Sequence, residues 1–323
     1  MYENAVNNIN AEEDIIMKWS DLSIDPLVSI CCTTYNHESF IEDALKGFLI
    51  QKTSFPFEIL IRDDASTDLT PEIVRKYESL YSTIIKVIYE SENQYSKGVR
   101  PLKALMGIAR GKYIAVCEGD DYWTDPLKLQ KQIDFLEEND DYVVTFHDAI
   151  IVNNEGGLVS RSKLAEDQKR DYLANDLVTE GRLLTLTMCF RNVINDYPAE
   201  YDRVFNCDRF LMVLLGLHGK AKYMGDEIEP AVYRQHSGGI WSGMKNTEQQ
   251  FQNLNTMIHI YTYLKRIEKN SLAVVFFENQ VAPRVREIYF PESHMLSSLI
   301  KAKMKCIYCH GLNKIVKIYK SFM

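Results

Sequence analysis

The sequence contains no apolar run of the length that a membrane span requires, and its N-terminal end has no basic segment followed by an apolar stretch. A membrane-spanning helix needs roughly 18 or more consecutive apolar residues, and an export signal combines a basic segment with an apolar one. The two absences argue against an integral membrane protein and against an exported one. We therefore expect a cytoplasmic protein.

Positive charge is scarce over most of the chain. The 37 lysine and arginine residues are outnumbered by 45 aspartate and glutamate residues, so the formal net charge is −8 at pH 7. A protein that binds nucleic acid usually presents a basic surface. We therefore expect no nucleic-acid partner, although a local site for a small anionic ligand remains compatible with this composition.

Acidic residues are missing from the C-terminal end. Residues 293–323 contain six lysines among apolar side chains and no aspartate or glutamate. Such a segment can lie on anionic lipid, with its apolar side chains in the lipid boundary and its lysines at the headgroups. A basic helix packed against the acidic body is the alternative interpretation. The first interpretation predicts peripheral contact with the inner face of the plasma membrane.

Glycine is missing from the loop after the first predicted strand, which reads Thr33-Thr34-Tyr35-Asn36. A dinucleotide-binding turn needs glycines so that the backbone can approach the pyrophosphate, and nucleotide pyrophosphorylases also use a glycine-rich first loop. The sequence therefore argues against both of these classes.

Apolar runs of strand length alternate with helical patterns from residue 27 onward. The predicted strands cover residues 27–33, 57–62, 84–89, 112–117 and 142–147. Helices are predicted to begin at the capping box Ser39–Glu42, at Thr70-Pro71 and at Asp125-Pro126, and residues 248–270 form one further helix. This alternation is typical of a mainly parallel sheet in an α/β fold.

The same patterns predict three regions. Residues 1–26 are polar and acidic, without clean periodicity, and form an N-terminal extension. Residues 27–242 form the α/β domain, and residues 243–323 form a helical C-terminal region with the basic tail.

Three carboxylates follow the fourth predicted strand, in the run Glu118-Gly119-Asp120-Asp121. Clustered carboxylates repel one another, so such a run at a strand end usually means that they share a divalent cation. Their hard oxygen ligands favour Mg²⁺ or Mn²⁺ over Zn²⁺. A solvated acidic turn is the alternative interpretation.

Four motifs occur in order along the chain. They are the segment from Val28-Ser29-Ile30 to Tyr35-Asn36, Asp63-Asp64-Ala65-Ser66-Thr67-Asp68, Ala109-Arg110-Gly111-Lys112-Tyr113-Ile114, and the acidic run. Together they resemble the inverting nucleotide-sugar glycosyltransferases of family two. The resemblance covers about residues 27–242. It implies the GT-A fold, a Rossmann-like and mainly parallel sheet flanked by helices, here with a C-terminal helical extension.

The resemblance implies a nucleotide-binding role for five residues. Thr33 and Tyr35 match the residues that hold the nucleobase, and Asp64 matches the carboxylate that reads the uracil edge. These matches imply a UDP-sugar donor. Asp120 matches a residue that contacts both metal and pyrophosphate, and Arg100 lies slightly off the position at which the family often has an arginine.

The resemblance also implies the metal ligands. Asp120 is the best candidate for an Mn²⁺ or Mg²⁺ ligand, with Asp121 beside it and Glu118 at a position where the family more often has aspartate. In the segment from Tyr233 to Trp241, His236 or Arg234 would reach the metal or the pyrophosphate when this segment closes over the donor.

The catalytic base implied by the resemblance is Asp208. It lies in Asn206-Cys207-Asp208-Arg209-Phe210, where Cys207 replaces the glutamate that the family commonly has. A carboxylate held near the anomeric carbon can take the proton of the acceptor hydroxyl as the sugar–phosphate bond breaks. A helix-terminal charge that interacts with the helix dipole is the alternative interpretation of Asp208.

These observations predict a metal-dependent inverting glycosyltransferase, of the hexosyl- or N-acetylhexosaminyltransferase kind. The resemblance implies that the acceptor is a glycan or a lipid-linked oligosaccharide, in the synthesis of a bacterial capsule, O-antigen or exopolysaccharide. A glycoside hydrolase also uses paired carboxylates, but it needs neither a nucleotide-binding loop nor a metal motif. A non-catalytic sugar-nucleotide-binding or scaffold protein is the remaining alternative.

Overall fold

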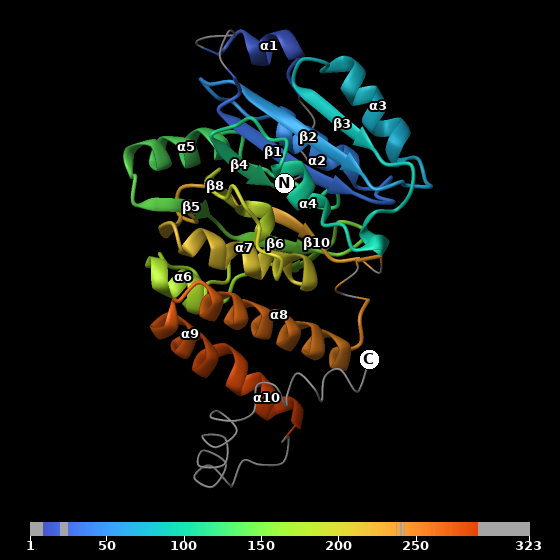
Figure 1. Ribbon diagram of the computed structural model, residues 1–323. Coiled ribbons are helices and arrows are strands. Elements are labelled where there is room, and N and C mark those ends of the chain that lie inside the picture. The colour runs from blue at the N-terminus through green and yellow to red at the C-terminus, as the bar shows by residue number, and fades with distance from the viewer. Residues whose placement is uncertain (1–8, 20–24, 237, 240, 242, 290–323) are drawn as a thin grey trace, which may run out of the picture.

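The computed structural model describes residues 9–19, 25–236, 238, 239, 241 and 243–289 (Figure 1). The basic tail predicted at residues 293–323 lies outside the described residues. Among the described residues, no helix combines the length and the apolar character needed to cross a bilayer.

A seven-stranded sheet forms the centre of the fold. Its strands, in spatial order, are β3 (Ile85–Tyr89), β2 (Phe57–Asp63), β1 (Val28–Thr34), β4 (Tyr113–Val116), β8 (Cys189–Arg191), β5 (Tyr142–Phe146) and β9 (Lys220–Tyr223). The five predicted strands are confirmed as β1 to β5, each within one residue of its predicted ends. The short β8 was not predicted, and it pairs antiparallel with both β4 and β5. The sheet is therefore mainly parallel, as expected, with one antiparallel insertion.

Alternate side chains of the strands point to two separate cores. Ile30 and Cys32 of β1 face the core that contains α2 (Ile41–Leu49), α3 (Thr70–Leu80) and α5 (Lys128–Glu138). Cys31 faces the other core, which contains α4 (Pro101–Met106), α6 (Ala174–Glu180) and α7 (Cys207–Gly216). A strand buried on both faces reads as a continuous apolar run, which accounts for Ile30-Cys31-Cys32 in the middle of β1.

The predicted helix caps are corrected by the structure. Helix α2 begins at Ile41 without a side-chain cap, so the capping box at Ser39 is not formed. Its glutamate instead accepts a hydrogen bond from the hydroxyl of Tyr77. Helix α3 begins at Thr70, where it was predicted, but Thr70 does not cap it, because the hydroxyl of Thr70 accepts a hydrogen bond from the backbone N–H of His37.

The third helix begins later than predicted. Helix α5 begins at Lys128, after the prediction at Asp125, because the carboxylate of Asp125 accepts the backbone N–H of Leu127 at 2.7 Å and so holds a turn before the helix.

The described part of the N-terminal extension contains a short helix that was not predicted, α1 (Glu12–Ile16). Ile15 is buried in the core of the α2, α3 and α5 side. Glu12 accepts hydrogen bonds from the backbone N–H groups of Thr83 and Ile84. This part of the extension is therefore fixed against the turn between α3 and β3.

A second, three-stranded sheet continues from the central one. It consists of β10 (Ala231–Arg234), β6 (Ala149–Val152) and β7 (Leu158–Ser160), with β10 parallel to β6 and β7 antiparallel to it. The backbones of Tyr122 and Val232 form an isolated bridge. This bridge brings the end of β10 beside the acidic run that follows β4.

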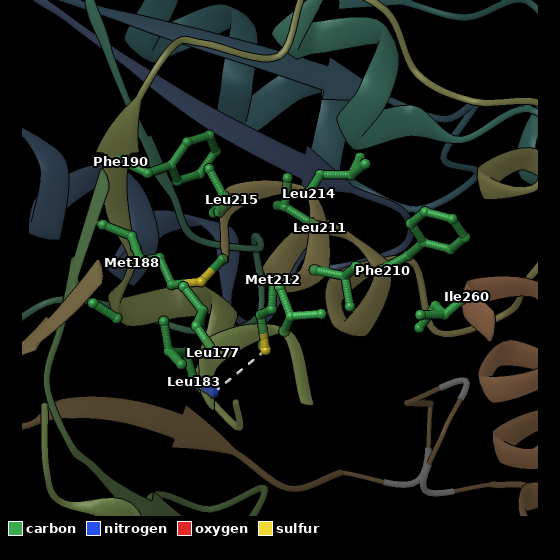
Figure 2. Close-up of a cluster of buried hydrophobic side chains, with 14 of the residues drawn as sticks. Leu177, Leu183, Met188, Phe190, Phe210, Leu211, Met212, Leu214, Leu215 and Ile260 are labelled. Carbon is green, nitrogen blue, oxygen red and sulfur yellow. Dashed lines mark hydrogen bonds between the residues drawn. The ribbon is translucent and has the colours of Figure 1, made fainter. Parts of the chain in front are cut away.

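The C-terminal helices pack against the α6 and α7 side of the domain. They are α8 (Asn246–Arg266), α9 (Asn270–Phe276), a π turn (Phe277–Val281) and α10 (Ala282–Tyr289), and in Figure 1 they stack below α7. Ile260 of α8 and Phe210 of α7 belong to the same buried cluster (Figure 2). The predicted helix over residues 248–270 is observed as α8, which ends earlier, at Arg266.

A buried polar network connects β1, β2 and the turn before β4. Glu58 accepts hydrogen bonds from the hydroxyl of Ser29 at 2.7 Å and from the backbone and guanidinium of Arg110. The backbone N–H of Gly111 donates to the same serine hydroxyl at 2.9 Å. Part of the third motif, Arg110-Gly111, therefore joins neighbouring strands, and Gly111 has no room for a side chain.

We expect Gly111→Ala to destabilise the protein by about 1–3 kcal/mol, the usual cost of overpacking a core. A Cβ atom at this position would lie 2.5 Å from the backbone nitrogen of Ser29 and 2.7 Å from the carbonyl of Tyr113. Gly107→Ala is the matched control, because its nearest neighbour would lie at 3.4 Å and its φ is −68°. Urea unfolding of both variants checks the prediction, and an unchanged midpoint for Gly111→Ala would contradict it.

Candidate active site

The carboxyl ends of β1, β2, β4 and β10 carry the candidate site residues. Tyr35 and His37 follow β1, Asp64 follows β2, the acidic run follows β4, and His236 follows β10. Ligands of open α/β sheets bind at this edge.

Asp120 lies between two histidines. Its Oδ2 is 3.0 Å from Nε2 of His236 and 3.8 Å from Nε2 of His37. One ligand atom from each of the three residues lies within 4.8 Å of the other two, a spacing that could hold a metal ion. We call His37, Asp120 and His236 the His–Asp–His cluster.

Two turns fix the position of His37. Asn36 has a φ of +53°, a conformation that asparagine tolerates better than most residues. Its backbone N–H donates to the hydroxyl of Ser66, and its side chain accepts the N–H of Thr67. The backbone of His37 in turn donates to Thr70 at 2.8 Å. The loop after β1 is thus fastened to the loop after β2, which holds the imidazole of His37 near Asp120.

Arg234 sets the shape of the acidic run. Its backbone N–H donates to Asp121 at 2.8 Å, and its guanidinium donates to the carbonyl of Asp120 and to the carboxylate of Asp43. The carboxylate of Asp121 is therefore engaged by the backbone of β10. Asp120 is left to face the histidines, so Asp120 and His236 are the two predicted metal ligands that the structure brings together.

The three carboxyl groups of the run differ in their pKa values. Burial, and then the charge of Asp120, raise the pKa of Glu118 to about 7. Burial raises the pKa of Asp121 well above its ordinary value, with the charges of Asp120 and Glu118 adding to the effect. Burial also acts to raise the pKa of Asp120, but the hydrogen bond from His236 and the charge of His37 outweigh it and lower this pKa. Ionisation of Glu118 and Asp121 is therefore disfavoured, whereas ionisation of Asp120 is favoured.

The His–Asp–His cluster has the donor set of a divalent metal site. Burial lowers the pKa of His37, which favours the neutral imidazole that a metal requires. Its Nδ1 is buried and has no hydrogen-bond partner among the described residues. A cation beside Asp120 would also relieve the repulsion within the acidic run. The residues present therefore fit a divalent ion.

The predicted nucleobase residues lie on the loops after β1 and β2. Tyr35 is 42% exposed, so its ring is available for stacking. Thr33 is half-buried, and its carbonyl accepts the N–H of Gly119 at 2.9 Å. The two carboxylate oxygens of Asp64 accept the backbone N–H groups of Gln94 and Tyr95 at 2.8 and 3.0 Å. Asp64 therefore fixes the loop around Tyr95, and its predicted contact with uracil stays a prediction.

Arg100 precedes α4 and points toward the start of α7. Its guanidinium donates to the carbonyl of Asp202 at 3.0 Å. Its charge lowers the pKa of Cys207, although burial raises that pKa more and leaves it at about 11. The structure thus places Arg100 beside the residue that precedes Asp208, and its nucleotide-binding role stays a prediction.

Asp208 lies in the first turn of α7, on the wall of a cavity of about 500 Å³. The residue is exposed at the cavity surface, but desolvation of its carboxyl group by the surrounding protein raises its pKa. The charge of Asp208 contributes to the raised pKa of Glu118. Asp208 therefore lines the cavity and also lies close enough to the acidic run for its charge to act on Glu118.

His37 is a candidate site residue that the sequence patterns did not single out. It directly follows Tyr35-Asn36 of the first motif. A histidine at the carboxyl end of a predicted strand could therefore have been identified as a possible metal ligand from the sequence. Its partners Asp120 and His236 are distant in the sequence. Pattern reasoning alone could not bring the three together.

Comparison with known proteins gives one family match. Residues 29–197, about half of the chain, match the sequence model of Glycosyl transferase family 2. This range includes the β1, β2 and β4 loops and ends before Asp208.

Two curated relatives share parts of the chain. An uncharacterised protein of Mycobacterium tuberculosis is 35% identical over 227 residues, which cover 69% of this chain and 63% of the relative. The chain thus matches less than two thirds of the length of that relative. The Escherichia coli UDP-Glc:alpha-D-GlcNAc-diphosphoundecaprenol beta-1,3-glucosyltransferase WfaP is 38% identical over 112 residues, which cover 34% of this chain and 41% of WfaP.

A solved structure shares the fold. The structure of S. aureus TarS in complex with UDP-GlcNAc superposes with a TM-score of 0.60 at 20% identity, and covers 84% of this chain and 76% of the TarS chain. The similarity supports the expected GT-A fold over most of the described residues.

Proposed function

The chain belongs to glycosyltransferase family 2, and from this membership we propose that it transfers a sugar from a UDP-sugar to an acceptor hydroxyl with inversion at the anomeric carbon. The observation that carries the proposal is that two groups share one site: the charges of Asp120, in the His–Asp–His cluster, and of Asp208 both act on Glu118. The His–Asp–His cluster is suited to hold a metal ion, and Asp208 is suited to accept a proton.

The proposed donor is a UDP-sugar. WfaP is named as a UDP-Glc-dependent enzyme, and TarS was solved with UDP-GlcNAc. In this chain, Tyr35 offers an exposed ring for the base. Asp64 and Thr33 lie at the ends of the neighbouring strands β2 and β1.

The protein's own residues would carry the transfer in a single displacement. Asp208 takes the proton of the acceptor hydroxyl as the hydroxyl oxygen attacks the anomeric carbon and the bond to the diphosphate breaks. A divalent ion in the His–Asp–His cluster would supply positive charge for the departing diphosphate. Arg234 holds Asp120 in place for that role through its bond to the carbonyl of Asp120.

The donor set favours Mn²⁺ over Mg²⁺. Mg²⁺ prefers oxygen ligands, whereas imidazole suits later transition metals. A site with two imidazoles and one carboxylate combines both kinds of ligand, and Mn²⁺ is the ion of the predicted pair that tolerates nitrogen better.

The proposed setting is bacterial surface polysaccharide synthesis, with a glycan or lipid-linked oligosaccharide as acceptor. The diphosphoundecaprenol in the name of WfaP supports a lipid-linked acceptor. Contact of residues 293–323 with the inner face of the plasma membrane stays part of this proposal. Flotation with anionic vesicles tests it, and a protein that stays unbound at low salt would rule it out.

We expect slow, metal-dependent hydrolysis of a UDP-sugar, which can be measured without knowing the acceptor. The full chain is incubated with UDP-glucose, UDP-N-acetylglucosamine, UDP-galactose and UDP-glucuronate, and release of UDP is followed with Mn²⁺, with Mg²⁺ and with chelator. UDP release should be faster with Mn²⁺ than with Mg²⁺ and absent with chelator. Binding of UDP-sugars without any turnover, in this assay and with candidate acceptors, would support the scaffold alternative instead.

A further inference from the structure

The cavity beside Asp208 is rich in arginine. Its walls carry Arg182 from the loop after α6, Arg209 from α7 and Arg284 from α10, with Asp208 at one side and Trp241 on another wall. We call this space the arginine cavity. In a protein with a net charge of −8, three guanidinium groups on one cavity need an explanation.

Among the described residues, these three arginines form no ion pair with a carboxylate, unlike several other arginines of the protein. Arg170, Arg191 and Arg234 each form an ion pair with an aspartate or glutamate. In the part of the chain that the structure describes, none of the three arginines of the cavity has a carboxylate oxygen within 4.0 Å. The hydrogen bonds of Arg209 and Arg284 go to uncharged groups.

The three positive charges also act on one another. The pKa of Arg209 is lowered to about 10, mainly by burial, and the charges of Arg284 and Arg182 add to this lowering against the opposing charge of Asp208. Burial lowers the pKa of Arg284, again with a contribution from Arg182. Positive charges that line one cavity and repel one another favour the binding of an anion between them.

Two of the arginines are held in place before any ligand binds. Arg209 donates to the carbonyl of Val178 at 2.6 Å. Arg284 donates to the carbonyl and to the side chain of Gln280, at 2.7 and 3.1 Å. Gln280 belongs to the π turn between α9 and α10, and π turns often occur at functional sites. Such fixed donors lose little freedom when an anion binds.

The position of the cavity indicates which substrate carries the anion. Asp208 lines the cavity, whereas none of His37, Asp120 and His236 does. A ligand of the arginine cavity therefore lies on the side of the base, which is the acceptor side. A second cavity of about 530 Å³ shares Arg182 and Gln280 with the first, so the surface continues away from Asp208 and has room for an extended molecule.

We propose that the arginine cavity is an acceptor subsite that binds a phosphate or diphosphate group of the acceptor, next to the hydroxyl that Asp208 deprotonates. The assignment to the acceptor rests on the proposed function through Asp208. Phosphate suits the cavity better than carboxylate does, because three cationic groups approach from three separate elements and a tetrahedral phosphate presents oxygens in more directions than a planar carboxylate. Guanidinium groups match both anions in pairwise geometry.

Isothermal titration calorimetry with inorganic pyrophosphate tests the subsite. The full chain is titrated in metal-free buffer of constant ionic strength, with malonate as the carboxylate probe. We expect pyrophosphate to bind more tightly than malonate. Equal binding of the two, or binding of malonate alone, would overturn the assignment to phosphate.

Four variants locate the binding. Arg182→Gln and Arg284→Gln should each weaken pyrophosphate binding about tenfold, the loss expected for one charge-assisted hydrogen bond. Arg286→Gln is the matched control, because it removes the same charge from an exposed position of α10 outside the cavity. Asp120→Ala should leave pyrophosphate affinity within about twofold, because it lies on the donor side. Equal losses in Arg286→Gln and Arg284→Gln would mean nonspecific attraction and would overturn the proposal.

Titration with UDP and Mn²⁺ separates this inference from the proposed function. If UDP binds but the affinity for pyrophosphate is unchanged in Arg182→Gln and Arg284→Gln, the proposed subsite is rejected and the transferase proposal stands. If pyrophosphate binding depends on both arginines but UDP does not bind, the cavity is an anion site and its assignment to a sugar acceptor fails with the transferase proposal. Thermal unfolding of each variant confirms that it is folded.

Discussion

Asp120→Ala is expected to lower metal-dependent turnover of the UDP-sugar by about a hundredfold to a thousandfold, the usual loss when one group that stabilises developing charge is removed. Asp120 is the carboxylate of the His–Asp–His cluster, and both histidines point at the same oxygen. The variant should remain folded, because Arg234 bonds the backbone carbonyl of Asp120 and not its side chain. Release of UDP with and without Mn²⁺ is the measurement.

Two further variants make this result specific. His37→Ala should raise the Mn²⁺ concentration that gives half-maximal activity, since it removes one of the three proposed ligands. Asp134→Ala, on the exposed face of α5, removes a carboxylate outside the site and should change nothing. If wild-type activity were the same with chelator as with Mn²⁺, the cluster would not be a metal site.

Asp208→Asn is expected to lower sugar transfer by at least about a hundredfold, the low end of what a positioned base contributes. The asparagine keeps the size of the side chain and its place at the start of α7, but it cannot accept the proton. Binding of UDP should remain nearly unchanged, because Asp208 lines the arginine cavity on the acceptor side. Loss of UDP binding together with transfer would make Asp208 a donor-site or structural residue.

The same residue predicts a pH dependence. Because the surrounding protein raises the pKa of Asp208 above its ordinary value, the carboxylate becomes protonated at a higher pH than a typical aspartate. Protonation removes the base, so kcat/KM should fall as the pH decreases through that raised pKa, with a slope of one proton. The wild-type profile should show this limb and the Asp208→Asn profile should lack it.

The local motifs of the sequence determined much of the fold. The five strands β1 to β5 were predicted to within one residue, because each is a continuous apolar run between turn-forming residues. The order of strand and helix predicted the mainly parallel sheet, and the family match and the structural similarity support it. The resemblance of the loops after these strands to a known family also pointed to Tyr35, Asp64 and Asp120, which the structure places at the carboxyl ends of β1, β2 and β4.

Helix ends and short strands were harder to predict, because distant partners decide them. Thr70 would cap its own helix in isolation, but its hydroxyl instead accepts a hydrogen bond from the backbone N–H of His37. Strand β8 contains three residues and has no periodicity of its own. It exists because it fills the space between β4 and β5.

The sequence by itself determined the family, the main sheet and the loops that carry the chemistry, because hydrophobic periodicity and turn residues act over a few neighbouring positions. Only the tertiary structure decided which side chains meet. Asp120 and His236 are 116 positions apart and are joined through the pairing of β10 beside the acidic run. Arg182, Arg209 and Arg284 come from three elements that the packing of α6, α7 and the C-terminal helices brings around one cavity. These arginines come together because the elements that carry them bury apolar surface against one another. The order of residues along the chain does not show which elements pack together.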